Sequence, residues 1–374
     1  MRHHPVKMTE PALFRAFPTL SARLPHHPFL SGTTPVTPLS GAGLPGGMYV
    51  KRDEESTPGY GGNKPRKLEF LVGAACERGA GRLVTTGGLG TNHGLATTML
   101  GRAAGLATTL ILVDQPLTSE VRESLRLFTA WGAQIVDARN VPGAILRGSA
   151  AFARSLLRGE RPVLVPAGGS NPTGILGAVS LALELGEQVR DGALPEPVNL
   201  YVAVGTGGSL AGLVLGLRLA GLATRPIGVL VNDILPPAPR PLARLAKRAL
   251  ALLRHADRSV PDIAISPGDF SLVTRQLGPG YGAPTAAAHE AITLAAHGGL
   301  RLDPTYTGKG FAEVLARARS GELETPSLFW NTFNSADPWA GAPAPPAPAA
   351  LPPRLRKLAF EGGSTPRAEG ADRF

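Results

Sequence analysis

The 374-residue chain has a single cysteine, Cys76, and aromatic residues make up only 5% of it. One thiol excludes a disulfide framework and a cysteine-based zinc cluster within the chain, and we predict no metal site. Acidic residues are also scarce relative to basic ones, 28 against 38, so the formal net charge is +10. This excess permits anionic partners such as phosphates, carboxylates or nucleic acid, but it does not define a fold.

Long uninterrupted apolar runs are missing as well. The most apolar stretch, residues 199–231, is broken by a glycine-rich turn, by Arg218 and by Arg225-Pro226. A membrane-spanning helix needs about 20 mostly apolar residues in succession. The N-terminal segment has basic residues but no apolar run behind them, unlike a secretory signal peptide. We therefore expect a soluble, cytoplasmic protein without a membrane partner.

Hydrophobic residues (43%), glycine (47 residues) and proline (36 residues) are by contrast plentiful. The hydrophobic share is sufficient for a sizeable core. The glycines and prolines have no collagen-like period, so they mark turns and loops. The tract Gly341 to Pro353 consists almost entirely of proline and alanine, and we expect residues 341–374 to form a flexible, semi-extended tail.

From Met48 to Asp233 short β-branched runs alternate with amphipathic runs. Residues 82–88 and 107–113 have the pattern of strands, and residues 92–105 between them have helical spacing of apolar side chains. Repeated strand–helix units predict an α/β fold with mainly parallel sheets flanked by helices. The units are too numerous for one small sheet, which favours two lobes.

One expected helix, residues 236–258, is strongly basic, with six arginine or lysine residues beside regularly spaced leucines. Its basic face could bind nucleic acid or acidic lipid. A solvated amphipathic helix on the surface of a lobe explains the same pattern, and we favour it. The sequence offers no aromatic-rich basic surface of the kind that binds single strands, so we expect no nucleic-acid partner.

Ligands of open α/β sheets bind beyond the carboxyl ends of the strands. The turns at such positions are unusually rich in glycine and polar residues, and they lie at residues 61–67, 87–93, 167–174 and 205–209. Two later segments, 278–282 and 303–310, have the same character. These six segments are the candidate site.

Gly205-Thr206-Gly207-Gly208-Ser209 follows a strand and begins a helix. Backbone N–H groups at such a helix start form an anion cradle, to which Thr206 and Ser209 can add hydroxyl groups, and a phosphate fits it. The turn is neither a Walker loop nor a complete dinucleotide motif. A glycine turn without a ligand, or a nucleotide site, remains possible on this pattern alone.

Lys64 follows two glycines and precedes an apolar helix. Most lysines are solvated surface charges, but a lysine held near apolar surface beside other cations, here Arg66 and Lys67, has a lowered pKa and can form a Schiff base. A phosphate cradle, such a lysine and polar loops together suggest pyridoxal 5'-phosphate as the cofactor.

The segments GGNKPRKLEFL, TTGGLGTNH, PAGGSNPTGILG, GTGGSLAGL, GPGYG and DPTYTGKG occur in this order. In this respect the chain resembles the D-cysteine desulfhydrase and 1-aminocyclopropane-1-carboxylate (ACC) deaminase family over about Phe14 to Asn331. The resemblance implies a pyridoxal-phosphate enzyme of the tryptophan-synthase-β-like fold (fold type II), with a small amino acid as substrate. It further implies a large cofactor-binding lobe of residues 1–65 and 173–340, a small inserted lobe of residues 66–172, and a homodimer.

Carried over by position, Lys64 matches the family's Schiff-base lysine, and Lys67 matches the lysine near the cofactor phosphate. Asn92 matches the asparagine at the pyridine 3′-hydroxyl, and His93 the histidine of the desulfhydrase branch. The implied phosphate loop comprises Gly205, Thr206, Gly207, Gly208 and Ser209. The implied active-site tyrosines are Tyr281 and Tyr306. Thr91 stands where the family has a serine that contacts the substrate carboxylate and takes part in proton transfer, so Thr91, Asn92 and His93 form the implied substrate site.

The residue after Tyr306 distinguishes the reactions. In the deaminases it is a glutamate that keeps the pyridine nitrogen protonated, whereas here it is Thr307, a neutral hydroxyl. Together with His93, this favours β-elimination over ring opening. Either Lys64 or a tyrosine made acidic by the site would take the Cα proton.

Three segments depart from the family pattern. Thr91 adds a methyl group, Gly94-Leu95-Ala96 lacks the usual polar residues, and Asn331-Thr332-Phe333-Asn334 replaces a threonine-glycine-glycine stretch. Thr332 can still reach the pyridine nitrogen. The departures keep two alternatives open: ACC deaminase-like ring opening, and a non-catalytic relative that binds the cofactor or an amino acid. A nucleotide or nucleic-acid binder that uses the basic helix is the remaining rival.

Overall fold

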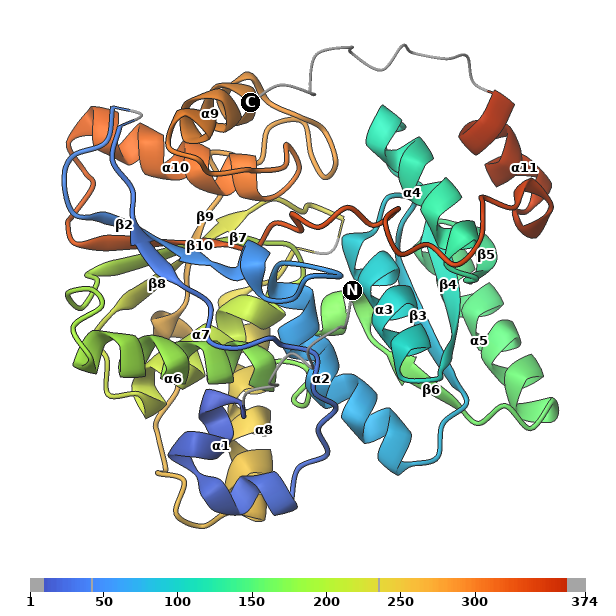
Figure 1. The fold of residues 1–374 in the computed structure, drawn as a ribbon, viewed down its shortest axis with the longest axis horizontal. Helices are drawn as coiled ribbons and strands as arrows, with labels where there is room; N and C mark the ends of the chain where they lie inside the picture. The colour runs from blue at the N-terminus through green and yellow to red at the C-terminus, as the bar shows by residue number, and fades with distance from the viewer. Residues whose placement is uncertain (1–9, 42, 235, 362–374) are drawn as a thin grey trace, which may run out of the picture. The chain divides into compact units, whose positions relative to one another are not determined.

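The computed structural model describes residues 10–41, 43–234 and 236–361. The chain forms two compact units (Figure 1). The larger unit comprises Met1–Gly79 and Val165–Asp337, and the smaller unit comprises Ala80–Leu164 and Pro338–Phe374. The α/β architecture predicted from the alternating pattern is confirmed in both units.

The larger unit contains a six-stranded sheet in the order β1-β2-β10-β7-β8-β9. The antiparallel strand β1 (Val36–Pro38) lies beside β2 (Met48–Arg52), and the other neighbours are parallel. The remaining strands are β7 (Asn199–Val204), β8 (Arg225–Leu230), β9 (Ser271–Val273) and β10 (Ser327–Asn331). All residues of β7 and β10 are buried, as expected for central strands covered on both faces.

Helices cover both faces of this sheet. The side chains of β7 alternate between two apolar clusters: Leu200 and Val202 join one, and Tyr201 joins the other. The first cluster contains residues from α1 (Ala12–Ala16), α2 (Asn63–Glu77), α6 (Leu176–Arg190), α7 (Gly208–Leu219) and α8 (Pro239–Ala256). The second contains residues from α9 (Ala286–His297) and α10 (Thr307–Ser320).

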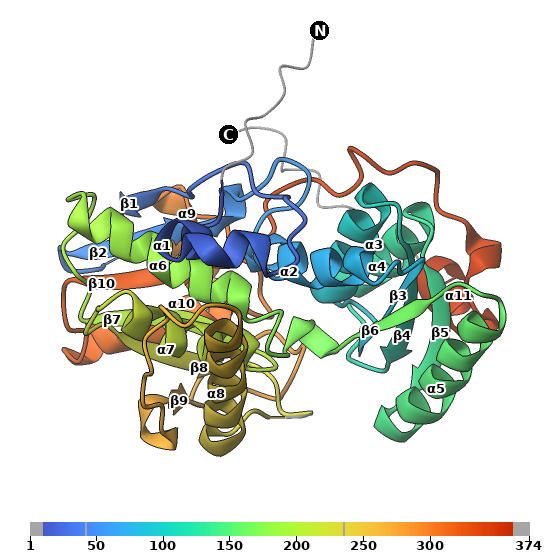
Figure 2. The same ribbon diagram turned by 90° about the horizontal axis from the view of Figure 1, so that it is seen from below.

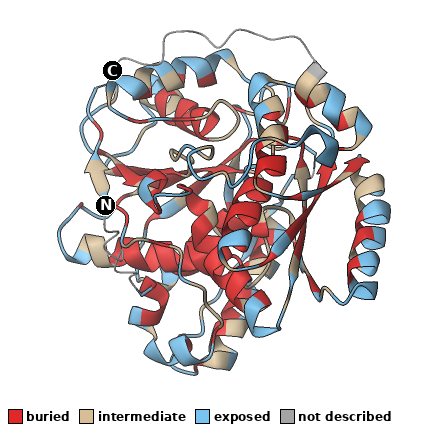
Figure 3. Ribbon diagram, turned by 45° about the vertical axis from the view of Figure 1, so that its right-hand side comes forward, coloured by how far each residue is buried: buried red, intermediate tan, exposed pale blue. Residues whose placement is uncertain are grey.

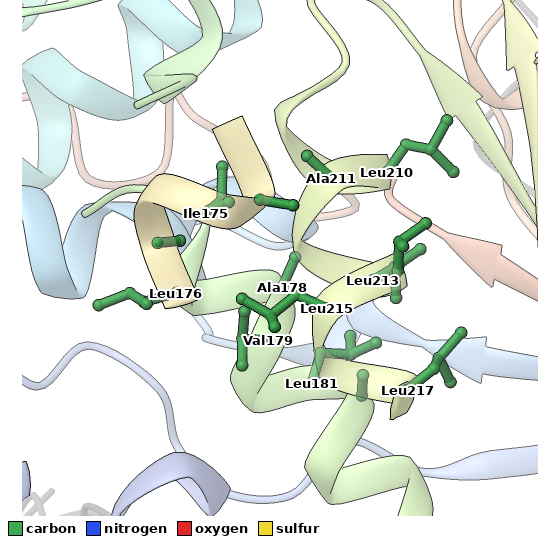
Figure 4. Close-up of a cluster of buried hydrophobic side chains, with 14 of the residues drawn as sticks. Ile175, Leu176, Ala178, Val179, Leu181, Leu210, Ala211, Leu213, Leu215 and Leu217 are labelled. Atoms are coloured by element: carbon green, nitrogen blue, oxygen red, sulfur yellow. The ribbon is translucent and has the colours of Figure 1, made fainter. Parts of the chain in front are cut away.

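Helices α6 and α7 pack closely in the first cluster, as the side chains in Figure 4 show. Glycine in α7 makes this approach possible, because a Cβ atom at Gly212 would lie 2.5 Å from the carbonyl oxygen of Ile175. The tight packing fixes the first turn of α7, which follows the glycine-rich turn after β7. Both helices are almost wholly buried in Figure 3.

The smaller unit contains a four-stranded sheet in the order β5-β4-β3-β6. Its strands are β3 (Arg82–Gly88), β4 (Ala107–Val113), β5 (Gln134–Arg139) and β6 (Pro162–Val165), and β3, β4 and β5 are parallel. Its helices are α3 (Asn92–Ala103), α4 (Ser119–Ala130), α5 (Val141–Leu157) and the short α11 (Pro353–Arg356). Hydrogen-bonding caps start three of them, at Thr91, Thr118 and Asn140.

The boundaries between the units differ from the predicted lobes 1–65 plus 173–340 and 66–172. Helix α2 lies wholly in the larger unit, because Phe70 packs with Leu13 and Leu176 in its core. A Cβ atom at Gly177 would lie 2.3 Å from the carbonyl oxygen of Arg66, so α2 and α6 are in close backbone contact. The chain returns to the larger unit at Val165, before the turn at 167–174.

The expected flexible tail also differs from the structure over residues 341–361, which pack on the smaller unit (Figure 2). The backbone N–H of Ala347 donates to Thr129 Oγ1 (3.0 Å), and Arg354 forms an ion pair with Asp137. Leu351 and Leu355 are buried. A proline-rich segment can pack where intervening leucine and arginine side chains find apolar and acidic partners. Residues 362–374 of the predicted tail lie outside the described residues.

Helix α8 is the basic helix expected from the sequence. Its leucines face the core, and Arg240, Arg244 and Lys247 are exposed. Within the described part of the chain, no helix has the length and apolar character needed to cross a membrane.

Candidate active site

Lys64 lies in the first turn of α2, a helix that begins at Asn63 directly after the glycine pair Gly61-Gly62. A Cβ atom at Gly61 would lie 2.2 Å from the carbonyl oxygen of Glu54, and one at Gly62 would lie 2.4 Å from that of Thr332. Gly62 also has a φ of +86°, in the region that favours glycine. Only glycine permits this loop, which therefore holds Lys64 against the chain that follows β10.

The Lys64 ammonium is part of a short polar chain. Its Nζ donates to Asn63 Oδ1 (2.8 Å), and Asn63 Nδ2 donates to Ser209 Oγ (3.0 Å). Burial lowers the pKa of Lys64 to about 8, and the carboxylate of Asp303 opposes this shift. A lysine with such a pKa is partly neutral near physiological pH, so it can act as a nucleophile or a base.

Arg66 does not act on Lys64 in the way the sequence suggested. Its guanidinium is fully buried and donates to Asp53 and to Glu184 on α6. Burial disfavours all these charges, but the carboxylates outweigh it and raise the pKa of Arg66. Lys51 adds a second cation to Glu184. The cluster fixes α2 in the larger unit, and Lys67 is the cation whose charge couples with that of Lys64.

The glycine-rich turn 205–209 connects β7 to α7, and Gly207 there has a φ of +83°. It lies against the loop that follows β6: the hydroxyl groups of Ser170 and Thr206 are 2.7 Å apart. A Cβ atom at Gly168 would lie 2.4 Å from Thr206 Oγ1, and one at Gly208 would lie 2.3 Å from Ser170 Oγ. Small residues are therefore required on both sides of this contact.

Lys67 lies at the same place, because its Nζ donates to the carbonyl oxygen of Gly168 (3.0 Å). Burial, followed by the charge of Lys64, holds its pKa well below the ordinary value. A phosphate monoester requires hydrogen-bond donors. The site offers the first-turn N–H groups of α7, the hydroxyls of Thr206 and Ser209, and the buried amine of Lys67, whose charged form an anion would favour. These residues fit the phosphate group of pyridoxal phosphate.

Tyr281 and Tyr306 form a pair, with their hydroxyl oxygens 2.6 Å apart and their rings in an edge-to-face arrangement. A Cβ atom at Gly205 would lie 3.4 Å from Tyr306 Cε1, so the pair adjoins the glycine-rich turn. Burial raises the pKa of both phenols, most strongly that of Tyr306. The expectation of a tyrosine made acidic by the site is wrong for this chain: both hydroxyls stay protonated at neutral pH and are proton donors.

Thr307 begins α10 and is fully buried. Its hydroxyl donates to Asp303 Oδ2 (2.7 Å) and accepts from the backbone N–H of Asp303 (2.8 Å). Thr307 thus presents no charge of its own, but it is bonded to a carboxylate.

The residues that follow β10 contact the glycine loop before Lys64 and the side chain of Arg301. The backbone of Thr332 contacts Gly62, and Asn334 Oδ1 accepts from the N–H of Gly61 (2.7 Å). The ring of Phe333 lies beneath the guanidinium of Arg301, 5.8 Å from Cζ to the ring centroid. Asn334 therefore supports the loop that carries Lys64.

In the smaller unit, Thr91, Asn92 and His93 are together at the start of α3. Thr91 Oγ1 accepts from the N–H of Gly94 (3.1 Å). A Cβ atom at Gly94 would lie 2.4 Å from the Thr91 methyl carbon. Asn92 is exposed, and Thr91 and His93 are buried. Gly94 thus makes room for the methyl group of Thr91.

The fold, the glycine-rich turn that suits a phosphate and the lysine of lowered pKa fit a pyridoxal-phosphate enzyme. Residues 29–329 match the family model described as "Pyridoxal-phosphate dependent enzyme", and the chain belongs to this family. The cofactor predicted from the sequence is thereby confirmed.

Similar proteins show to which group within this family the chain belongs. The chain is 31% identical to a protein of Pyrococcus horikoshii named "Putative 1-aminocyclopropane-1-carboxylate deaminase", over 84% of this chain and 93% of that one. It is 33% identical to the D-cysteine desulfhydrase of Salmonella paratyphi B, over 79% and 87% of the two chains. The Nocardicin C-9' epimerase of Nocardia uniformis subsp. tsuyamanensis is 31% identical, over 88% and 98%.

The solved structure of an ACC deaminase homologue matches this chain with a TM-score of 0.72 and 29% identity, covering 88% of this chain and 96% of that chain. The predicted family and the fold type II architecture are therefore confirmed. The protein is a pyridoxal-phosphate enzyme of the D-cysteine desulfhydrase and ACC deaminase group, a group that acts on amino acids.

Four residues of the site were not predicted as functional. Asn63 connects Lys64 to Ser209, Ser170 contacts the glycine-rich turn, Tyr60 is a third buried phenol, and Asp303 acts on several of these groups. Asn63, Ser170 and Asp303 lie within the glycine-rich and polar segments predicted to form the site. The sequence therefore indicated where these residues lie but not what each of them does. Tyr60 immediately precedes the first of these segments.

Proposed function

We propose that the protein catalyses β-elimination from a small amino acid, in the manner of a D-cysteine desulfhydrase. For D-cysteine the balanced reaction takes up one water and gives pyruvate, ammonia and hydrogen sulfide. The observation that carries this proposal is Thr307: the hydroxyl stands where a ring-opening deaminase has a carboxylate, and it is bonded to Asp303. Because Thr307 brings no charge of its own to this position, a substrate with a good leaving group at Cβ suits the site better than a substrate that requires ring opening.

In this proposal most of the residues assigned to the cofactor lie in the larger unit, and Asn92 lies in the smaller unit. Lys64 would bind its carbonyl carbon, the turn 205–209 and Lys67 its phosphate, and Asn92 its ring hydroxyl, with Thr307 and Thr332 toward the ring nitrogen. Bound pyridoxal phosphate supplies an electron sink that stabilises negative charge at the substrate Cα.

The residues of the chain supply the proton transfers. The amine of Lys64, with its pKa lowered to about 8, takes the proton from Cα. The Tyr281–Tyr306 pair, protonated at neutral pH, gives a proton to the departing thiolate. The helix start at Thr91-Asn92-His93 binds the substrate carboxylate, since backbone N–H groups there favour an anion. Water then hydrolyses the remaining enamine to keto acid and ammonia.

The test is to mix the protein, reconstituted with pyridoxal phosphate, with D-cysteine, L-cysteine or ACC, and to quantify sulfide, keto acid and ammonia. The Lys64→Ala variant is the control for free cofactor. Sulfide and pyruvate in equal amounts from D-cysteine support the proposal. 2-Oxobutyrate from ACC alone would instead support ring opening, and no turnover of any amino acid would support a non-catalytic relative. Running the reaction in heavy water separates elimination from inversion at Cα, because an epimerase returns deuterated substrate.

The proposal includes a homodimer, which the family resemblance implies. Sedimentation of the cofactor-loaded protein measures its oligomeric state. A monomer at micromolar concentration would contradict the proposed homodimer.

A further inference from the structure

We infer that Lys309 is a positioning residue that holds Tyr281 against Tyr306, so that the two phenols deliver one proton in a fixed direction. The inference rests on the proposed function for what the proton does, and on the structure for how the pair is held. Lys309 lies in the first turn of α10, three residues after Tyr306.

Lys309 is completely buried, and its ammonium holds the loop that carries Tyr281. Nζ donates to the carbonyl oxygens of Leu277 (2.7 Å) and Gly280 (3.1 Å), the second of which is adjacent to Tyr281. Burying an ammonium is unfavourable unless hydrogen bonds compensate. The two carbonyl groups compensate the buried charge of Lys309, and Lys309 in turn fixes their positions.

A second anchor holds the same loop from the end of β8. The backbone N–H of Tyr281 donates to Asp233 Oδ1 (2.9 Å). Gly280 approaches Asp233 so closely that a Cβ atom there would lie 2.7 Å from Oδ2, and its φ is +133°. The loop is therefore attached to two elements at or just before Tyr281, namely α10 through Lys309 and the end of β8 through Asp233.

The other tyrosine is anchored by the same helix start. The carboxylate of Asp303 accepts from the backbone N–H groups of Thr305 (2.9 Å), Tyr306 (2.7 Å) and Thr307 (3.1 Å), as well as from the Thr307 hydroxyl. A carboxylate is favourable at a helix N-terminus. Residues 303–309 thus set the positions of both phenols.

The separation of 2.6 Å between the phenol oxygens explains why such fixation matters. In a pair of hydroxyls one donates to the other, and the second is left with one proton to give elsewhere. An O–H···O bond weakens rapidly beyond about 3.0 Å. Movement of the Tyr281 loop by about one ångström would uncouple the phenols and leave the direction of proton delivery undefined.

The first test needs no cofactor. Lys309→Met removes the ammonium with little change in length, Lys309→Arg keeps the charge, and Lys247→Met on the exposed face of α8 is the matched control. Tyrosine ring carbons labelled with ¹³C report each phenol by NMR during an alkaline titration, with Tyr281→Phe and Tyr306→Phe identifying the signals. Burial raises the pKa of both phenols, but the hydrogen bond between them raises that of Tyr306 further and lowers that of Tyr281. We therefore expect Lys309→Met, which uncouples the pair, to bring the pKa of Tyr306 down and that of Tyr281 up. Lys309→Arg should show a smaller change, and Lys247→Met none. Unchanged phenol titration in a folded Lys309→Met protein would overturn the inference.

The second test uses the enzyme loaded with pyridoxal phosphate and the substrate it turns over. We expect Lys309→Met to lower kcat by about tenfold or more, as the loss of a placed proton donor does, with KM little changed. In a Tyr306→Phe background the same substitution should have almost no further effect, since both changes break one unit. Equal losses in both backgrounds would contradict a role through the phenol pair.

Should Lys309→Met fail to fold, Asp233→Ala removes the other anchor from an exposed position, and the same shift of the Tyr281 titration is expected. An unshifted titration in that variant would count against the inference. If the wild-type enzyme turns over no amino acid, the proposed function fails, but the titrations of the cofactor-free protein still decide whether Lys309 holds the pair.

Discussion

Thr91 and Gly94 fit one another at the start of α3: the methyl group of the threonine occupies the place that a Cβ atom at position 94 would need, 2.4 Å away. The threonine hydroxyl caps the same glycine. The cap and the close packing are therefore one feature: the glycine leaves room for the methyl group of the threonine that caps the helix.

This relationship predicts non-additive stability changes. Gly94→Ala should destabilise the protein by about 1–3 kcal/mol, because it overpacks the site. In a Thr91→Ser background the methyl group is gone, so the same substitution should cost much less. Denaturant unfolding of the four proteins in the cycle measures the difference. Equal destabilisation in both backgrounds would show that the methyl group is not what excludes a side chain at position 94.

The lowered pKa of Lys64 predicts how its reactivity depends on pH. Only the neutral amine attacks a carbonyl carbon, so the rate of attachment of pyridoxal phosphate to the cofactor-free protein should rise as pH increases through about 8, not near the ordinary value of 10.5. Asp303 opposes the shift, so Asp303→Asn should move the midpoint to lower pH. Borohydride trapping at a series of pH values measures both. A wild-type midpoint near 10.5, or a rise in the midpoint of the variant, would refute the environment described for Lys64.

The lowered pKa of Lys67 predicts that the protein takes up protons when it binds a phosphate group. Burial holds its pKa well below the ordinary value, and a bound phosphate group would favour the protonated amine, so phosphate binding should increase the protons bound at Lys67. At about pH 8 a phosphate monoester is already dianionic, since its second pKa is about 6. Calorimetric titration with pyridoxal phosphate in two buffers of different ionisation enthalpy counts the protons. Lys67→Met should lose this uptake, and identical uptake by wild type and variant would exclude Lys67 from the phosphate site.

The buried cluster of Arg66, Asp53 and Glu184 stabilises the helix that carries Lys64. We therefore predict that loss of one of its charges strongly destabilises the protein. Glu184→Gln leaves Arg66 and Lys51 undercompensated in the interior, so we expect a loss of about 3–5 kcal/mol in the free energy of unfolding. Glu187→Gln on the same helix breaks the more exposed pair with Arg15 and should cost less than about 1 kcal/mol. Urea unfolding of both variants compares them, and similar losses would mean that the buried cluster does not fix α2.

The same cluster makes the stability of the folded protein depend on pH. Burial alone would raise the pKa of Glu184, but Arg66 and Lys51 lower it to about 2. Because the folded pKa lies below the ordinary value of 4.5, the stabilisation is complete above pH 4.5 and is lost as pH falls toward 2. Glu184→Gln should therefore show a weaker loss of stability over this range than the wild type.

Local patterns predicted much of the fold and of the candidate site. The strands and helices from 48 to 233 follow from apolar periodicity, and Lys64 and the turn 205–209 were identified by glycine spacing. Pairings between distant segments could not be foreseen. Arg66, two residues after Lys64, suggested a cation acting on the lysine, but the fold turns it toward Glu184, over a hundred residues away. The raised pKa of Tyr281 and Tyr306 likewise depends on burial, which the sequence of a loop does not reveal.

The central claim is that Lys64 binds pyridoxal phosphate in this chain. The most direct measurement is borohydride reduction of the cofactor-loaded protein, followed by digestion and mass spectrometry of the peptides. We predict that the reduced cofactor is attached to Lys64, and that Lys64→Ala loses the attachment while Lys247→Met keeps it. Attachment to Lys67 or another lysine, or its persistence in Lys64→Ala, would contradict the claim.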